Sequence, residues 1–336
     1  MKYAPVIIPT LCRYEKFVQC MESLRKNSWA KYTEIYVAVD YPSKESHWDG
    51  YNKICEYLNQ DFPEFKAMHI TKRPYNCGAG DNSNALKKEV FKRHDRFIYT
   101  DDDVEFSPNF LEYIDKTMEY YNDDSDVVAV CGYSYPLEWD VSNGSNVFKS
   151  SAGCFMWGTG FWREKYIPIR SKLESGILRE EYKTGRKGLW RKKLIDARYI
   201  EFLSLGTSDA KCLLDAATDA GIGTYIGLFD KYAIIPVISK TRNFGFDGTG
   251  LYCQNITEFA FDASDYNYAH QPIDSNFNFV LCPDTFLHES ENKKIWNRFD
   301  SRKNIKIRSF VIEIKCFLRK ILGDNQYQKL KRIIKH

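Results

Sequence analysis

Short apolar runs alternate with amphipathic stretches along the first 131 residues of the chain. The runs have the length of strands, and the amphipathic stretches repeat apolar residues every three or four positions, as helices do. The predicted strands are 5–9, 35–39, 67–70, 97–100 and 127–131. The predicted helices are 15–24, 48–58, one from about Asn82, and one that Ser107 caps with Pro108 at its first position. This alternation predicts an α/β fold with a doubly wound, mostly parallel sheet.

The alternation weakens after residue 131. Glycine and aromatic residues gather in SAGCFMWGTGFWREKY, and a basic helical stretch follows at about 176–203. The segment LGTSDAKCLLDAATDAG predicts a helix with Thr207 or Ser208 as its N-cap, and RNFGFDGTGLYC predicts a glycine-rich loop. From about residue 302 the sequence predicts an appended helix.

Composition narrows the class of protein. The chain has 336 residues, of which 43% are hydrophobic and 15% aromatic, so a sizeable core is expected. Its ten cysteines show neither C-x-x-C pairs nor zinc-ligand spacing, which favours reduced thiols in a cytoplasmic protein. No signal peptide is recognisable in MKYAPVIIPT, and no apolar run is long enough to span a membrane.

Polar residues follow the predicted strands at positions where α/β sheets bind ligands, outside the carboxyl ends of the strands. They are Thr10, Arg13, Asp40, Asn76 and Asp101–Asp103. Three adjacent carboxylates repel one another unless a cation compensates them, and hard oxygen ligands suit Mg²⁺ or Mn²⁺. Such ions use one or two carboxylates together with substrate phosphates. The pattern predicts a metal–diphosphate site; the alternative is an acidic strand end without a function.

The segment FIYTDDDVEFSPNF resembles the D-x-D region of GT-A fold glycosyltransferases. The resemblance to these enzymes extends over roughly residues 4–253. The likeness is greatest to the inverting N-acetylglucosaminyltransferase-I type and to bacterial surface-polysaccharide transferases of the family 2-like group. It implies a nucleotide-sugar donor, most simply UDP-linked, and Mn²⁺ or Mg²⁺. It also implies that Asp103 binds the metal, that Asp102 contacts the donor's sugar or ribose, and that Asp101 supports the metal from a position where glutamate is commoner.

Other segments resemble further parts of such a donor site. The resemblance implies that Arg13, after Thr10 in the first strand–helix turn, faces the nucleotide phosphates or base, and that Asp40 accepts from uracil N3–H. NCGAGDNSN resembles an N-x-G loop, with Asn76 and Asn84 as donor contacts and Ser83 where an arginine is common. For Thr10, Arg13 and Asp40 the alternative is a role as turn and cap residues.

Two later segments complete the predicted donor site. The glycine–aromatic segment around Gly160 would form the floor under the donor sugar, or else a packed core turn. The late loop carries Arg242, which could stabilise the diphosphate. It has Tyr252 where relatives have a histidine, a role open to His270 or His288.

Inversion requires a carboxylate that takes the proton of the acceptor hydroxyl. GTSDAKCLL resembles the S-W-D segment that carries this base, which points to Asp209. A position in the first turn of a helix favours the ionised form, although Asp209 could merely complement the helix dipole. Asp215 and Asp219 are weaker candidates.

The last 35 residues are basic, with eleven Lys and Arg against Glu313 and Asp324 in residues 302–336. The tail charge is therefore about +9 (eleven minus two), which leaves about −6 for residues 1–301 out of the total of +3. Phe310, Val311, Ile314, Phe317, Leu318, Ile321 and Leu322 form an apolar stripe flanked by Arg308, Lys315, Arg319 and Lys320. Such a helix suits an anionic membrane surface; the alternative is a helix docked on the core. No nucleic-acid-recognition module is present in the sequence.

Together these features predict a cytoplasmic, metal-dependent glycosyltransferase with a glycan or lipid-linked oligosaccharide as acceptor. Residues 1–150 would form the nucleotide-sugar-binding half, 151–300 the acceptor-binding half of the same domain, and 301–336 a helical tail. A sugar-phosphate nucleotidyltransferase and a non-catalytic glycan-binding protein are the alternatives.

Overall fold

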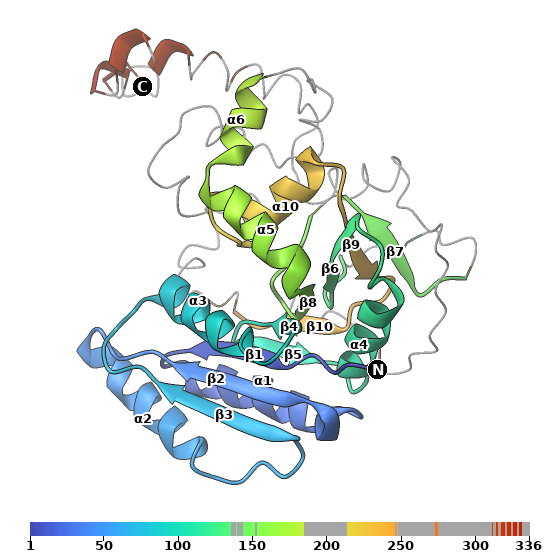
Figure 1. Cartoon of the computed structure of the whole chain (residues 1–336). Helices are drawn as coiled ribbons and strands as arrows, with labels where there is room; N and C mark the ends of the chain where they lie inside the picture. Colours follow the sequence, from blue (N-terminus) through green and yellow to red (C-terminus); the bar gives the residue numbers. More distant parts are fainter. Residues whose placement is uncertain are drawn as a thin grey trace.

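A computed structural model describes residues 1–135, 139, 144–151, 153–184, 214–245, 247, 273–274 and helical residues between 311 and 330. Within these ranges, a mixed sheet of eight strands has the order β3-β2-β1-β4-β8-β6-β9-β7 (Figure 1). The strands are β1 Val6–Thr10, β2 Glu34–Val39, β3 Ala67–Lys72, β4 Arg96–Tyr99, β6 Val127–Cys131, β7 Val147–Ser150, β8 Thr159–Trp162 and β9 Tyr232–Pro236. A second, small sheet pairs β5 Val104–Phe106 with β10 Thr241–Asn243 in antiparallel register.

Most of the large sheet is parallel. β3, β2, β1 and β4 run the same way, and β6 and β9 share a direction with each other. β8 is antiparallel to both β4 and β6, which places it between the two parallel groups, and β7 is antiparallel to β9 at the edge. The predicted α/β class with a mostly parallel sheet is therefore confirmed.

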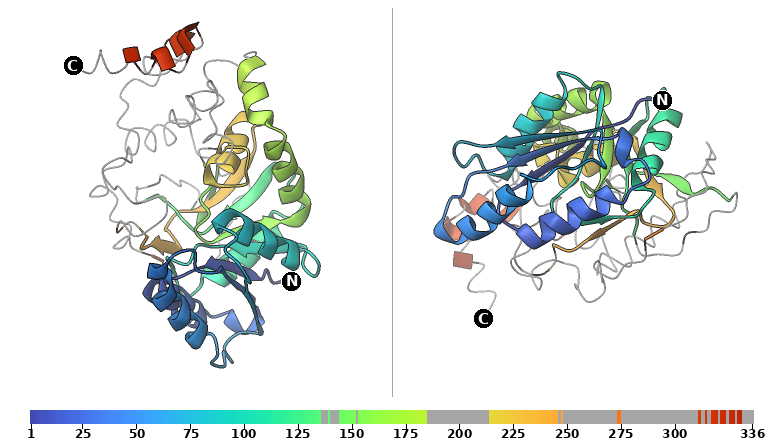
Figure 2. Two further views of the ribbon diagram at one scale, coloured as in Figure 1. Left: turned by 90° about the vertical axis from the view of Figure 1, so that its left-hand side faces the viewer. Right: turned by 90° about the horizontal axis from the view of Figure 1, so that it is seen from below.

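Helices cover both faces of the sheet, because successive residues of each buried strand point to opposite sides. Val6 and Ile8 join the buried cluster formed with α1, α2 and α4, whereas Ile7 joins the cluster formed with α3, α5, α6 and α10. The two layers are visible in Figure 2. The helices are α1 Tyr14–Arg25, α2 Trp48–Tyr57, α3 Ala79–Val90, α4 Phe110–Tyr120, α5 Arg163–Glu174, α6 Ile177–Thr184 and α10 Asp219–Leu228, with short 3₁₀ turns at Ala30–Tyr32 and Glu45–His47.

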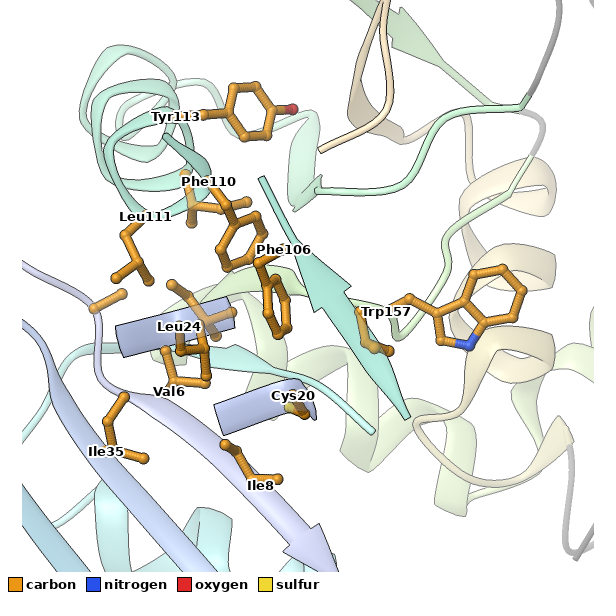
Figure 3. Close-up of a cluster of buried hydrophobic side chains, with 14 of the residues drawn as sticks. Val6, Ile8, Cys20, Leu24, Ile35, Phe106, Phe110, Leu111, Tyr113 and Trp157 are labelled. Carbon is orange, nitrogen blue, oxygen red and sulfur yellow. The ribbon is translucent and has the colours of Figure 1, made fainter. Parts of the chain in front are cut away.

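One apolar cluster fixes the small sheet against the large one. Cys20 and Leu24 of α1, Phe106 of β5 and Phe110 of α4 pack together beside β1 (Figure 3). The Phe106 and Phe110 rings lie 4.5 Å apart between centroids. β5 directly follows Asp101–Asp103, which we call the acidic turn. The packing of β5 therefore holds the acidic turn in place at its carboxyl end.

One predicted helix start and one predicted helix interior are wrong. Ser107 does not cap α4, which begins at Phe110: its hydroxyl donates to Asn109 Oδ1 at 2.9 Å and its N–H to the Lys240 carbonyl at 2.9 Å. The helix predicted over 205–221 does not continue through residues 215–218. Thr218 instead caps a new helix, α10, by accepting from the Gly221 N–H at 3.1 Å. A side chain at Gly221 would lie 2.0 Å from the Ala216 carbonyl oxygen, so the chain turns tightly there.

Candidate functional site

The acidic residues lie at the point where the strand order of the sheet reverses. From β1 the chain proceeds outward to β2 and β3, and then returns to the other side of β1 as β4. Thr10 and Arg13 follow β1, and the three aspartates follow β4. In open α/β sheets, ligands bind in the crevice outside the carboxyl ends of the two strands at such a switch point.

Asp102 is held by residues from the first strand–helix turn. The Thr10 hydroxyl donates to Asp102 Oδ2 at 2.6 Å, and the Arg13 guanidinium forms an ion pair with Asp102 Oδ1. The side chain of Asp102 is only 7% exposed. Thr10, Arg13 and Asp102 therefore form a direct network, and their contacts with a donor stay predictions.

Asp103 is bound by Arg13 and by the late loop. Arg13 Nη1 lies 2.7 Å from Asp103 Oδ2, and the Asn243 amide donates to Asp103 Oδ1 at 3.2 Å. The Phe244 N–H also donates to the backbone carbonyl of Asp103 at 2.8 Å. A side chain at position 245 would lie 2.0 Å from Asp103 Oδ2, so only Gly245 permits this approach.

Lys16 of α1 ties the late loop to the same site. Its ammonium donates to the Phe244 carbonyl at 2.8 Å and lies 3.0 Å from Asp247. Three stretches far apart in the sequence therefore meet at the acidic turn: the end of β1, the end of β4 and residues 243–247.

Asp101 faces a different environment from its two neighbours. The Tyr99 hydroxyl donates to Asp101 Oδ1 at 3.1 Å, and Ser83 of α3 hydrogen-bonds the same phenol. Burial raises the pKa of Asp101 well above its usual range, and the charges of Asp103 and Asp219 add to this rise. Asp219 is thus close enough to act electrostatically on the acidic turn.

Asp219 is the first residue of α10. Its Oδ1 accepts the Met156 N–H at 2.6 Å. Burial raises the pKa of Asp219 to about 6. A carboxylate with this pKa is largely ionised at neutral pH yet is a better proton acceptor than an ordinary aspartate.

Asp40 is committed to the backbone of a neighbouring loop. It accepts from the N–H groups of Tyr41, Cys77 and Gly78 at 2.8–2.9 Å and from the Asn76 amide at 3.3 Å. The Asn76 amide also donates to the Tyr41 carbonyl at 2.6 Å. These bonds order the turn at Gly78, whose φ of 80° favours glycine. The contact between Asp40 and a donor base stays a prediction.

The remaining predicted donor contacts are Gly160, Arg242 and Asn84, which lie in β8, β10 and α3. Gly160 lies inside β8, where an added Cβ would lie 2.6 Å from Met118 Sδ and 2.9 Å from Ile114, so its lack of a side chain admits α4. Arg242 pairs with Glu105 at 2.7 Å across the small sheet, and strand alternation turns it away from Asn243. Asn84 is half-buried on α3.

Asp209, Tyr252, His270 and His288 lie outside the described residues, so their predicted roles stay predictions. Sequence reasoning did not select Tyr99, Lys16 or Asn243, and it ranked Asp219 low. The position of Tyr99 two residues before Asp101 on a strand was a usable signal, since such residues face the same side. The pairings of Lys16 and Asn243 depend on long-range folding.

The acidic turn suits a divalent cation in its donor chemistry. Asp103 and Asp101 offer hard carboxylate oxygens beyond the carboxyl end of β4, and Mn²⁺ and Mg²⁺ prefer such ligands. Among the described residues, no three His, Cys, Asp or Glu side chains are arranged as a metal site. An ion here would therefore draw part of its coordination from substrate oxygens or water.

Comparison with known proteins gives limited likenesses. No family model matches the chain, and no curated protein matches it. Three solved structures share part of its architecture. Staphylococcus aureus TarS 1–349 with UDP has 16% identity over 41% of this chain and 39% of that chain, at a TM-score of 0.31. Mannosyltransferase PcManGT from Pyrobaculum calidifontis with GDP-Man and Mn²⁺ has 17% identity over 48% of this chain and 45% of that chain, at a TM-score of 0.35. GalNAc-T7 with UDP, GalNAc and Mn²⁺ has 12% identity over 80% of this chain and 50% of that chain, at a TM-score of 0.40.

In each case the match spans half or less of the solved protein. These likenesses concern the path of the backbone, and the chemistry of this chain is argued from its own residues. No helix in the described part of the chain is both long and apolar enough to cross a membrane.

Proposed function

We propose that the protein is a metal-dependent glycosyltransferase that uses a nucleotide-sugar donor. The observation that carries the proposal is the cluster of Asp101, Asp102 and Asp103 at the switch point of the sheet, bound by Thr10, Arg13 and Asn243. A site that only stabilised the fold would gain little from adjacent buried carboxylates, whose mutual repulsion is costly. A cation bound with a diphosphate would offset this repulsion.

Asp103 and Asp101 are the residues proposed to hold Mn²⁺ or Mg²⁺, which when bound neutralises the diphosphate leaving group. We propose that Arg13 contacts the phosphates, and its ion pairs with both Asp102 and Asp103 support this role. Thr10 and Asp102 would then face the ribose or the donor sugar. We propose UDP as the nucleotide and a hexose or N-acetylhexosamine as the sugar, following the resemblance of the acidic segment.

We propose Asp219 as a candidate base beside Asp209. In an inverting transfer, the acceptor hydroxyl oxygen bonds to the anomeric carbon as the bond from that carbon to the diphosphate oxygen breaks. The hydroxyl proton passes to a carboxylate. Asp219 stands near the acidic turn at a helix start, with one oxygen anchored by Met156. Asp209 is the competing candidate from the sequence, and the two are separable by substitution.

The acceptor is proposed to be a glycan or a lipid-linked oligosaccharide of surface polysaccharide synthesis, at the cytoplasmic face of a membrane. Such an acceptor carries hydroxyl groups, and a carboxylate base would take the proton of the attacking hydroxyl.

The experiment is calorimetric titration of the protein with UDP in the presence and absence of Mn²⁺, followed by a screen of nucleotide sugars for Mn²⁺-dependent release of nucleoside diphosphate. We expect UDP binding that depends on Mn²⁺. Absence of metal-linked nucleotide binding would refute the proposal. Asp61→Ala, at an exposed aspartate remote in sequence from the acidic turn, is a matched control for substitutions of the acidic residues.

The same screen separates the alternatives. A sugar-phosphate nucleotidyltransferase would instead form pyrophosphate from a nucleoside triphosphate and a sugar phosphate. A non-catalytic glycan-binding protein would bind sugar without consuming any nucleotide sugar.

A further inference from the structure

The helical residues between 311 and 330 expose large apolar side chains. The exposed fractions are 40% for Val311, 43% for Ile314, 64% for Phe317 and 64% for Ile321. Leu318 and Leu322 are half-buried. Isolated exposed apolar residues are ordinary, but several at helical spacing form a continuous ridge.

The spacing of these residues in the sequence suits one side of a helix. At 3.6 residues per turn, Val311, Ile314, Phe317, Leu318, Ile321 and Leu322 fall within an arc of about 140°. The helical segment, red in Figures 1 and 2, stands apart from the helices that cover the sheet. Val311, Ile314, Phe317 and Ile321 are therefore not fully buried against the helices that cover the sheet.

The charge of the same segment selects the class of partner. Residues 302–336 carry eleven Lys and Arg against two acidic residues, while residues 1–301 carry a net charge of about −6 by difference from the total. A second copy of this tail would bring two strongly positive segments together, which is unfavourable. An apolar ridge beside an excess of positive charge suits a surface that is apolar within and negative at its boundary.

We propose that this segment binds the interface of an anionic lipid membrane as a peripheral amphipathic helix. Val311, Ile314, Phe317 and Ile321 enter the boundary between headgroups and acyl chains, and the basic residues of the tail attract the lipid phosphates. The proposal stands on the exposed ridge and the charge, and does not depend on the function proposed for the acidic turn.

The test is sedimentation of the full-length protein with vesicles of phosphatidylcholine alone and of phosphatidylcholine with phosphatidylglycerol. We expect binding to the anionic vesicles that is at least about tenfold stronger than to the neutral ones and that weakens in high salt. The double variant Phe317→Ser/Ile321→Ser is expected to lose at least about tenfold in affinity, because the inserted apolar area is removed.

Ile167→Ser, at an isoleucine of α5 that is 47% exposed, is the matched control and should bind as the unmodified protein does. Circular dichroism and size-exclusion chromatography with light scattering accompany each variant. Equal binding to both vesicle types, unchanged binding of the double variant, or dimers that the double variant abolishes would each overturn the proposal; the last would identify a second copy as the partner. UDP titration of the same samples keeps this outcome distinct from that of the active-site proposal.

Discussion

Asp40 and Asp103 occupy equivalent places in the fold but are held in opposite ways. Each lies beyond the carboxyl end of a parallel strand and is nearly buried, at 3% and 7% exposure. Asp40 accepts three backbone N–H groups, which cannot leave without unfolding a loop. Asp103 is held by the side chains of Arg13 and Asn243, which can rotate away. A carboxylate bound by backbone N–H groups stabilises the loop, whereas one bound by a side-chain cation can exchange that cation for another.

The largest expected effect is that of Asp103→Ala on transfer. Loss of the proposed metal ligand removes stabilisation of the leaving diphosphate worth several kcal/mol, so the rate should fall by about 1,000-fold. Folding stability should change little, because the variant removes a buried charge together with its contacts. The rate is measured as release of nucleoside diphosphate, and stability by urea unfolding. Full activity in Asp103→Ala would show that the acidic turn does not bind the metal.

Asp40→Ala should have the opposite effect to Asp103→Ala: it should lower folding stability and leave metal-dependent UDP binding in place. Three backbone N–H groups would lose their acceptor, at roughly 1 kcal/mol each, so the free energy of unfolding should fall by about 3 kcal/mol. At temperatures where the variant is folded, the dependence of UDP binding on Mn²⁺ should persist. Urea unfolding with Asp61→Ala as the control measures the loss. Unchanged stability with lost UDP binding would instead assign Asp40 to the donor base, as the sequence resemblance implies.

Asp219 is intermediate between these two, since one backbone N–H and no ion pair holds it in the described contacts. Asp219→Asn should lower the transfer rate by at least about 100-fold while UDP binding is retained. With the pKa of Asp219 raised to about 6, the base is protonated at lower pH, so the rate should fall about tenfold per pH unit below that value.

The pH–rate profile of transfer checks this assignment. The acid limb should be absent from whatever activity remains in Asp219→Asn. A normal rate in Asp219→Asn together with a lost rate in Asp209→Asn would return the role of base to Asp209.

The sequence predicted what local patterns determine. Apolar runs located β1, β2 and β6 to within a residue, because a strand buried on both faces must be apolar throughout. The acidic turn was recognised from a local pattern too, because three aspartates directly follow a buried apolar strand. The helix predicted over 205–221 was wrong at 215–218, where the Thr218 cap and the close approach of Gly221 to Ala216 override helical periodicity.

Partners across the chain were beyond prediction. Nothing local to Asn243 or Lys16 indicates that these residues meet Asp103 and Phe244, because the contacts depend on how β10 pairs with β5. Arg242 shows the converse: its charge suggested a phosphate contact, but the register of β10 places it opposite Glu105.

The smallest expected effect tests whether Arg13 is the exchangeable cation. Because Arg13 Nη1 lies 2.7 Å from Asp103 Oδ2, a divalent ion that binds this oxygen must compete with the guanidinium. Arg13→Met removes this competitor and leaves two like charges facing each other, so affinity for Mn²⁺ without nucleotide should rise about tenfold. Affinity for UDP should fall if Arg13 also contacts the phosphates. Arg25→Met, at the last residue of α1, where Arg25 pairs with Glu22 and Glu64, should change neither affinity. Weaker Mn²⁺ binding in Arg13→Met would mean that the guanidinium positions the carboxylates for the ion, and the contrast between Asp103 and Asp40 would then rest on Asn243 alone.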